Sequence, residues 1–308
     1  MKILVTGGAG FLGANLCKRL LEEGHEVAAV DNFITGSPKN IRDLNKYPKF
    51  TFIKHNITQP FLSTNRELLT MNQIYHLACP TGVNNLVPLA EEMILTCSFG
   101  TRNVLELARK TGTKVLFTSS SEVYGDPQVS PQKEDYTGNV DTTGIRSPYE
   151  EGKRFAESLI LMYVRKYNVD AKIVRVFNTY GPKMSKKDTR VIPQFLRQAL
   201  ANQPITIHGK GLQTRTHCYV DDLVKGLILV LRKGQKGQVY NVGGEEQITV
   251  VNLAKIILKL TSSKSQLKFV ERPPHDHQSR QPDLTKIKKL GWKQKISLEQ
   301  GIRKTIEA

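Results

Sequence analysis

The sequence predicts an α/β fold with a doubly wound parallel sheet and a smaller C-terminal α/β lobe. Short apolar runs that end in polar residues alternate with segments of helical apolar spacing. A glycine-rich turn separates the first run from the first helical segment. Strands that alternate with helices in this way favour parallel pairing with crossover helices. A chain of 308 residues can also bury a sizeable core and add a second lobe.

The expected elements follow the apolar pattern along the chain. The first helix runs from the glycine-rich turn to about Glu23, and longer helices are expected at 86–111 and 147–167. Six strands of the main sheet are expected at 2–6, 26–30, 50–53, 73–78, the stretch beginning at Lys114, and 172–177. Shorter elements are expected afterwards at 191–202, 205–208, 239–242, 249–261 and 267–270. We therefore expect a first domain at 1–180, with a return of the chain at about 214–242, and an interleaved lobe at 181–308.

The charge of the chain favours an anionic small substrate over nucleic acid. The formal net charge is +17, from 45 Lys and Arg against 28 Asp and Glu. These residues are spread along the chain, without a long basic run or an interleaved aromatic stripe. A lysine-rich solvated surface with an electropositive cleft explains this distribution. Nucleic-acid binding is the less favoured explanation.

The apolar pattern and the cysteines indicate a cytoplasmic protein. No run approaches the ~18 apolar residues of a membrane span, and Met1-Lys2 leads directly into a strand-like segment. The four cysteines lack CxxC spacing, and three of them lie in apolar contexts, which favours free thiols in a reducing compartment. The seven histidines have no metal-ligand spacing, so no metal site is expected.

The glycine-rich turn predicts a Rossmann-type NAD-binding domain. Gly7, Gly10 and Gly13 follow the first strand and open the first helix, with the spacing G-x-x-G-x-x-G. Glycine lets the backbone approach a pyrophosphate held at the helix N-terminus. Asp31 ends the second strand, where a carboxylate accepts from ribose hydroxyls and repels a 2′-phosphate. A glycine motif alone is weak evidence, but its position between strand and helix favours NAD over NADP here.

A second group of polar residues carries the predicted chemistry. The strand from Lys114 ends in hydroxyls that include Ser120, followed by Glu122, where open α/β sheets place their ligands. Tyr149 and Lys153 are four residues apart on one helix, so they project from the same face. A nearby ammonium group lowers the pKa of a phenol, which can then act as a base on a sugar hydroxyl. Taken alone, a serine-rich loop and a surface Tyr–Lys pair are also common.

The chain resembles the extended short-chain dehydrogenase/reductase superfamily, and within it the UDP-glucuronate decarboxylase (UDP-xylose synthase) family. The resemblance covers nearly the whole chain. It is carried by TGGAGFLG (6–13), DNF with TG (31–36), YHLACP (75–80), SEVYGDP (121–127), PQKEDYTGNV (131–140), RSPYEEGKR (146–154), RVFNTYGPKM (175–184), QTRTHCYVDDLV (213–224) and RQPD (280–283).

The resemblance implies decarboxylation of UDP-glucuronate to UDP-xylose through a 4-keto intermediate, with NAD recycled. Tyr149 would be the base on the C4 hydroxyl, and Lys153 would lower its pKa and hold the nicotinamide ribose. Ser120 would bond the C4 oxygen, Glu122 would lie near C5, and Arg215 would serve the decarboxylation step.

The resemblance also implies binding residues and a homodimer through the helices at 86–111 and 149–167. The NAD set is Gly7, Gly10, Phe11, Leu12, Gly13, Asp31, Asn32, Phe33, Thr35, Gly36, Asn56, Ile57, Leu77, Thr96, Tyr149 and Lys153. The UDP-sugar set is Glu122, Tyr149, Asn178, Arg190, Val191, Arg215 and Arg280, of which Asn178, Arg190 and Arg280 are expected at the nucleotide.

Departures from the family pattern keep other functions open, and the first is Thr81-Gly82-Val83 after Ala78-Cys79-Pro80, where the family has ACPASP followed by an aromatic residue. Leu95 and Cys97 stand where the family has Lys and Asn, and Asn56 stands in place of Asp. The missing lysine removes a positive charge from the substrate side. A nucleotide-sugar 4-epimerase or another nucleotide-sugar modifier is the alternative; a 4,6-dehydratase would have Asp-Glu where Ser121-Glu122 stands. A non-catalytic NAD- or RNA-binding protein on the same fold is a more remote alternative.

Overall fold

The centre of the molecule is a sheet of seven parallel strands. The computed structural model describes residues 1–61, 66–185, 187–272 and 279–308. The strand order is β11-β6-β5-β4-β1-β2-β3, which confirms the predicted doubly wound sheet. The strands are β1 (Lys2–Thr6), β2 (Glu26–Asp31), β3 (Phe50–Lys54), β4 (Gln73–His76), β5 (Lys114–Ser120), β6 (Ala171–Val176) and β11 (Val239–Val242).

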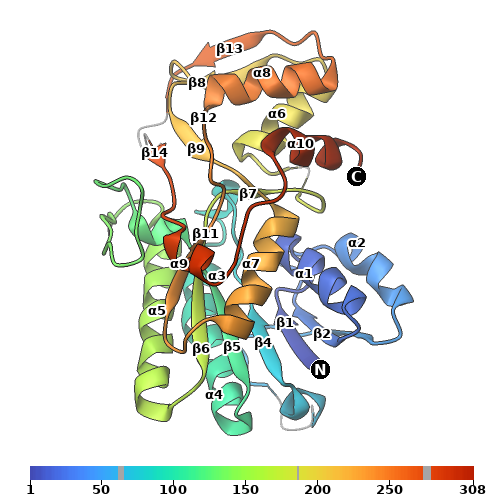
Figure 1. Cartoon of the computed structure of the whole chain (residues 1–308), viewed down its shortest axis with the longest axis vertical. Helices are drawn as coiled ribbons and strands as arrows, with labels where there is room; N and C mark the ends of the chain where they lie inside the picture. Colours follow the sequence, from blue (N-terminus) through green and yellow to red (C-terminus); the bar gives the residue numbers. More distant parts are fainter. Residues whose placement is uncertain (62–65, 186, 273–278) are drawn as a thin grey trace.

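Both faces of the sheet are covered, so its inner strands are apolar along most of their length. In β1, Ile3 and Val5 pack into the core on one face and Leu4 packs into the core on the other. Helices α1 (Phe11–Glu22) and α7 (Val220–Lys233) cover the first face, and α4 (Thr101–Thr111) and α5 (Ser147–Tyr167) cover the second (Figure 1). Such double coverage is the usual architecture of parallel sheets.

The segment predicted as one helix at 86–111 consists of three pieces. Helix α3 (Ala90–Leu95) is followed by a π-helical turn, Thr96–Gly100, and then by α4. A Cβ atom at Gly100 would lie 2.8 Å from Cδ1 of Ile57, so the turn packs closely against the loop after β3. Gly112 then ends α4 in the left-handed conformation at φ 69°, as its position after the apolar pattern predicts.

Helix α5 carries the predicted Tyr–Lys pair. It has Pro148 in its first turn and ends at Asn168 in the left-handed conformation, and both features are common helix boundaries. Its apolar face packs on the sheet through Ala156, Ile160 and Tyr163. Neither α5 nor any other helix in the described ranges is long and apolar enough to cross a membrane.

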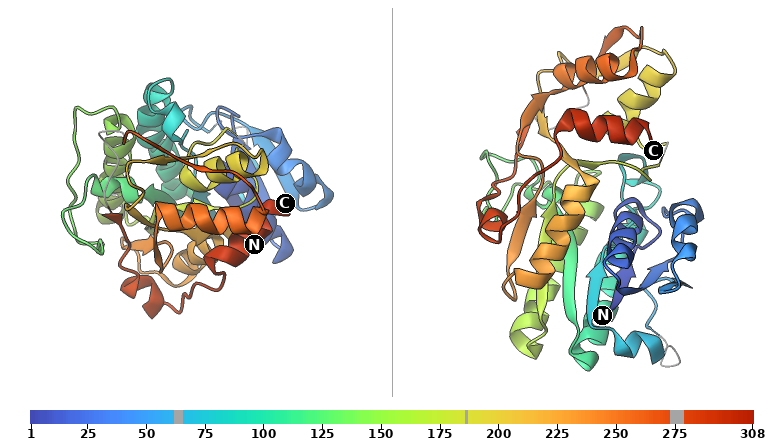
Figure 2. Two further views of the ribbon diagram at one scale, coloured as in Figure 1. Left: turned by 90° about the horizontal axis from the view of Figure 1, so that it is seen from above. Right: turned by 45° about the vertical axis from the view of Figure 1, so that its right-hand side comes forward.

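Three small sheets lie beyond the carboxyl ends of the central strands. In the upper part of Figure 1 and of the right view of Figure 2, α6 (Val191–Leu200), α8 (Val250–Thr261) and α10 (Leu298–Ile306) accompany the parallel pair β8 (Ile205–His208) and β13 (Leu267–Val270). β9 (Thr214–Thr216) lies between β12 (Gln247–Thr249) and β14 (Ser279–Arg280). The third pair is β7 (Thr179–Tyr180) with β10 (Cys218–Tyr219).

The chain then returns to the central sheet. After β9 it passes through β10 into α7, and β11 follows beside β6 with Val239 opposite Ile173. It leaves again through α8 and β13, and α9 (Thr285–Lys289) and α10 complete it after β14. The small sheets and the central sheet are therefore connected by several crossings of the chain. Helix α2 (Pro38–Ile41) lies at the other end of the sheet, after β2.

Candidate active site

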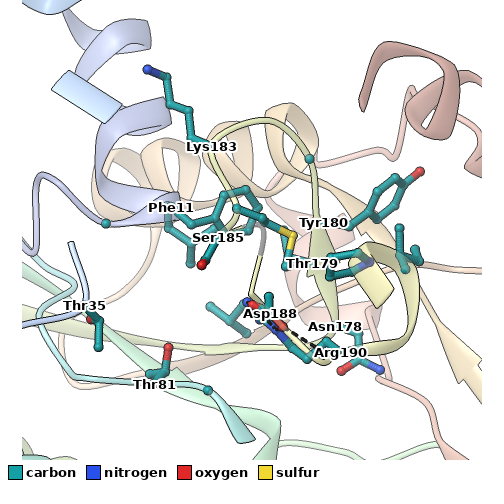
Figure 3. A pocket seen from close by; sticks show the side chains of 18 of the residues that line it. Phe11, Thr35, Thr81, Asn178, Thr179, Tyr180, Lys183, Ser185, Asp188 and Arg190 are labelled. Carbon is teal, nitrogen blue, oxygen red and sulfur yellow. Dashed lines mark hydrogen bonds and ion pairs between the residues drawn. The ribbon is translucent and has the colours of Figure 1, made fainter. Parts of the chain in front are cut away.

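A cavity of about 2690 Å³ lies between the carboxyl ends of the central strands and the small sheets. Figure 3 shows part of its wall, with Phe11 and Thr35 from the N-terminal side and Asn178 and Arg190 from the later part of the chain. Most of the residues predicted from the sequence line it. They are Gly7, Gly10, Phe11, Leu12, Gly13, Asp31, Asn32, Thr35, Asn56, Ile57, Leu77, Thr96, Ser120, Glu122, Tyr149, Lys153, Asn178, Arg190, Val191, Arg215 and Arg280.

Two residues of the predicted NAD set, Phe33 and Gly36, are not among the residues that line the cavity. The backbone N–H of Phe33 donates to Oδ1 of Asp31 at 2.8 Å, and its ring stacks on Phe52 at 4.9 Å. A Cβ atom at Gly36 would lie 2.7 Å from the same carboxylate oxygen. Phe33 therefore holds the Asp31 carboxylate through its backbone, and the absence of a side chain at Gly36 leaves room for it.

The glycine-rich turn and Asp31 fit a dinucleotide. Gly7 has φ +71°, and a Cβ atom there would lie 2.8 Å from the backbone nitrogen of Ala78, so only glycine allows this approach. A Cβ atom at Gly13 would lie 2.0 Å from the carbonyl oxygen of Gly7. The N-terminus of α1 thus faces the cavity, as an anion site requires.

The carboxylate of Asp31 is built into the same loop. It accepts from the backbone N–H groups of Ala9 at 3.0 Å and Phe33 at 2.8 Å. Burial raises its pKa, and these hydrogen bonds act in the opposite direction. Asp31 still lines the cavity, where its oxygens can accept from ribose hydroxyls. The turn and the carboxylate together fit NAD.

Ser120, Tyr149 and Lys153 meet at the end of β5. The hydroxyl of Ser120 acts on Tyr149 by lowering the pKa of its phenol, and its Oγ accepts from the backbone N–H of Glu122 at 3.2 Å. The ammonium group of Lys153 is buried, donates to the carbonyl oxygen of Thr118 at 2.9 Å and lies 4.7 Å from the ring centre of Phe117. The carboxyl-terminal end of β5 therefore fixes the direction in which the Lys153 side chain points.

The electrostatics of Tyr149 differ in part from the expectation. Burial raises its pKa to about 12, while the charge of Lys153 and the hydrogen bond from Ser120 lower it. Lys153 thus acts in the predicted direction, but desolvation of the phenolate is the larger effect. Burial lowers the pKa of Lys153 itself, yet Cys79, Cys97 and Tyr149 raise it, and the net pKa lies above its ordinary value.

Glu122 is held by two arginines that approach from different parts of the chain. Nη2 of Arg146, at the start of α5, donates to Oε2, and Nη1 of Arg280, in β14, donates to Oε1. Arg146 also donates through Nε to Glu150 at 2.9 Å. Sequence analysis did not include Arg146 or Glu150 in the site. Arg146 and Glu150 are four residues apart on one helix, and this spacing could have predicted their ion pair.

Arg280, which was predicted at the nucleotide, lies against Glu122 at the edge of the cavity. Its side chain is 4% exposed and donates to Glu122 and to the carbonyl oxygen of Gly125. The register of β14 against β9 pairs Arg280 with Arg215, so two predicted arginines stand on neighbouring strands. His217, two residues after Arg215, also lines the cavity. Its buried Nε2 has no hydrogen-bond partner in the described residues.

Arg190 approaches the cavity from the start of α6. Its guanidinium is bonded to the carboxylate of Asp188 by Nη2 at 2.6 Å and by Nε at 3.1 Å (Figure 3). Asp188 therefore restricts Arg190, the arginine that was predicted to contact the nucleotide. The sequence did not predict the role of Asp188, because an Asp two residues before an Arg is not a distinctive pattern. Asn178 and Val191 line the same cavity.

The geometry and the comparisons define the class of protein. The model of the NAD dependent epimerase/dehydratase family matches residues 3–243. The chain belongs to this family, and the fold and NAD predictions are confirmed.

The relatives narrow this class further. The chain is 42% identical over 304 residues to UDP-glucuronic acid decarboxylase 5 of Arabidopsis thaliana, covering 98% of this chain and 87% of that one. It is 40% identical over 307 residues to UDP-glucuronic acid decarboxylase 1 of Danio rerio, covering 99% and 72%. The structure of UDP-glucuronic acid 4-epimerase from Bacillus cereus, in complex with UDP-glucuronic acid and NAD, has a TM-score of 0.89, with 28% identity and coverage of 100% and 98%. The predicted resemblance to UDP-glucuronate decarboxylases is confirmed.

Replacement of Asp31 by Asn tests the cofactor assignment. Loss of the charge should weaken NAD binding by about tenfold, the effect of about 1.4 kcal/mol from a charged hydrogen bond, and should reduce discrimination against NADP. Calorimetric titration with both dinucleotides measures this. Glu26→Gln, at the exposed opposite end of β2, is the matched control and should leave both affinities unchanged. Equal affinities of Asp31→Asn and the unmodified protein for both dinucleotides would contradict the assignment.

Proposed function

We propose that the protein is an NAD-dependent UDP-glucuronate decarboxylase that forms UDP-xylose through a 4-keto intermediate. The observation that carries this proposal is the position of Glu122. Its carboxylate lies two residues from Ser120, is held by Arg146 and Arg280, and borders the cavity that also contains Tyr149. The two curated relatives described above, both UDP-glucuronic acid decarboxylases, support the same activity.

The first half of the reaction needs a base at the C4 hydroxyl. Tyr149 takes this proton, Ser120 donates to the C4 oxygen, and the fixed ammonium group of Lys153 stabilises the phenolate. NAD, when bound, accepts the C4 hydride and later returns it. Because the same hydride is used twice, the reaction has no net redox change.

The second half breaks the bond between C5 and the carboxylate. Oxidation at C4 makes the substrate a β-keto acid, so the electrons of the broken bond move onto the C4 oxygen as an enolate. Ser120 remains at that oxygen, and Arg215 serves the carboxylate that leaves as CO₂. Glu122 faces C5, which then takes one proton from solvent water, so the overall reaction consumes one proton. Tyr149 returns its proton to the C4 oxygen as the ketone is reduced. The high pKa of its phenol suits this return.

A 4-epimerase is the alternative, since the solved epimerase structure shares the fold. That reaction would not need the carboxylate of Glu122 or the decarboxylating role of Arg215. The residue that departs from the family lysine, Leu95, is not among the residues that line the cavity. Arg146 and Arg280 line it paired with Glu122, and Arg190 lines it paired with Asp188. Arg215 also lines it and offers a guanidinium to a glucuronate carboxylate.

We also propose that the protein acts as a cytoplasmic homodimer with the two interleaved units at 1–180 and 181–308. Helices α3 and α5 and the π-helical turn present exposed apolar side chains, namely Ile94, Phe99, Phe155 and Met162. Burying such a surface against a second copy would remove apolar area from water. The four free cysteines support a reducing compartment.

The activity is tested with UDP-glucuronate and catalytic NAD⁺. We expect release of CO₂ and formation of UDP-xylose, because the 4-keto intermediate loses its carboxylate before the ketone is reduced. Trapped labelled CO₂ and chromatography of the nucleotide sugars measure both products. Formation of UDP-galacturonate without CO₂ would show an epimerase instead.

Replacement of Glu122 by Gln tests the residue that distinguishes the reaction. Decarboxylation should slow by about 100-fold, the usual scale for loss of an acid–base group, so NADH should persist longer in a single turnover. Absorbance of NADH follows this phase, and calorimetry should give an NAD affinity within about twofold of the unmodified protein. Glu150→Gln is the matched control, since Glu150 is also bonded to Arg146 but does not line the cavity. Loss of NAD binding in Glu122→Gln would make Glu122 structural.

Replacement of Lys153 by Met tests the electrostatics of the base. The ammonium group stabilises the phenolate, so its removal raises the pKa of Tyr149 and moves the rise of the hydride-transfer rate to higher pH. We expect a shift of about one pH unit or more, which lowers the rate near neutral pH about tenfold. Single-turnover rates with saturating NAD, in brief pH jumps from pH 6 to 12, measure it, and Lys153→Arg, which keeps the charge, should shift less. An unshifted profile with a low plateau would mean that Lys153 only holds the cofactor.

A further inference from the structure

Two cysteine side chains meet beside the proposed catalytic residues. Sγ of Cys79, just after β4, lies 3.8 Å from Sγ of Cys97, in the π-helical turn. They are 18 residues apart in sequence, and the reaction described above uses neither thiol. Cys79 is partly exposed and lines the cavity, whereas Cys97 is 1% exposed.

Each cysteine adjoins a segment that holds the predicted ligands. The backbone nitrogen of Ala78 would lie 2.8 Å from a Cβ atom at Gly7, so Ala78 packs against the glycine-rich turn. Cys79 is the next residue and therefore adjoins this turn. A Cβ atom at Gly152 would lie 3.4 Å from Cβ of Cys97, so Cys97 packs against α5 between Tyr149 and Lys153. A change in the sulfur–sulfur distance would therefore act on both segments.

We propose that Cys79 and Cys97 form a redox-modification site, at which hydrogen peroxide converts the two thiols into an intramolecular disulfide that weakens NAD binding. The bond would shorten the sulfur–sulfur distance from 3.8 Å to about 2.05 Å. In this proposal, closing the gap draws the backbone after β4 toward the π-helical turn. This approach moves Ala78 relative to Gly7 and Thr96 relative to the cavity that it lines.

The chemistry balances with one peroxide molecule. A thiolate of the pair takes one oxygen from the peroxide, becomes a sulfenic acid and releases hydroxide. The other sulfur attacks it as a thiolate, the sulfur–sulfur bond forms, and a second hydroxide leaves. With the two thiol protons, the products are one disulfide and two water molecules. Both sulfurs are oxidised, and the peroxide is reduced.

The surroundings lower the pKa of one thiol and raise that of the other: the hydrogen bond with Cys97 and burial raise the pKa of Cys79. The hydrogen bond from Cys79 is the largest influence on Cys97 and lowers the pKa of its thiol to about 7; burial opposes this, and the charge of Lys153 adds to it. A thiolate is the reactive form toward peroxide. Peroxide reaches the pair from the cavity, where Cys79 is exposed.

The experiment treats the full-length protein with a modest excess of hydrogen peroxide, with and without saturating NAD. We expect two of the four thiols to be lost, a mass decrease of two hydrogen atoms, and a crosslink between the peptides that contain Cys79 and Cys97. Calorimetry should show NAD affinity reduced by about tenfold or more, with recovery after dithiothreitol. Saturating NAD should slow the oxidation. None of these measurements uses a sugar nucleotide, so they stand apart from the test of the decarboxylase activity.

Matched variants identify the residues. Cys97→Ser, with Cys97→Ala as a second variant if the first is poorly folded, should not form the crosslink. Cys218→Ser removes a buried cysteine outside the pair, and this variant should oxidise like the unmodified protein. Four intact thiols after treatment, oxidation to sulfinic acid without a crosslink, or a crosslink to another cysteine would overturn the proposal. A Cys79–Cys97 disulfide with unchanged NAD affinity would overturn its functional part.

Discussion

The carboxylate of Glu122 connects the parts of the molecule that form the site. Arg146 brings the first turn of α5 to it, and Arg280 brings β14, which is paired with the strand of Arg215. Arg280 is almost fully buried, and a buried charge is tolerated only when it is paired and hydrogen-bonded. The cluster therefore links the helix of Tyr149 to the strand that pairs with that of Arg215. The residue proposed to determine the reaction thus lies where these two parts of the cavity wall meet.

Much of the fold was predictable because its signals are local. Buried parallel strands are short apolar runs, and Gly112 and Pro148 mark helix boundaries in the sequence itself. The division of 86–111 was not predictable, since its π-helical turn packs against Ile57, which lies far away in sequence.

The same distinction applies to the site. Ser120, Tyr149 and Lys153 converge as predicted from a strand end and a helix face. The role of Arg146 was missed because Glu122 is 24 residues away, and the position of Phe33 behind Asp31 depends on a backbone turn that propensity does not reveal. The net pKa of Tyr149 depends on how much water the assembled cavity excludes, and no single segment of sequence contains that quantity.

The position of β11 has a consequence for how the chain is made. This strand forms one edge of the central sheet, yet it follows β6 only after β7–β10, α6 and α7 have been synthesised. A ribosome that has released the first 180 residues has therefore released neither α7, which covers one face of the sheet, nor the edge strand beside β6. The apolar surface of β5 and β6 on that face stays uncovered until translation has passed residue 242. A nascent chain paused in this interval would be a natural client for chaperones that bind exposed apolar strands.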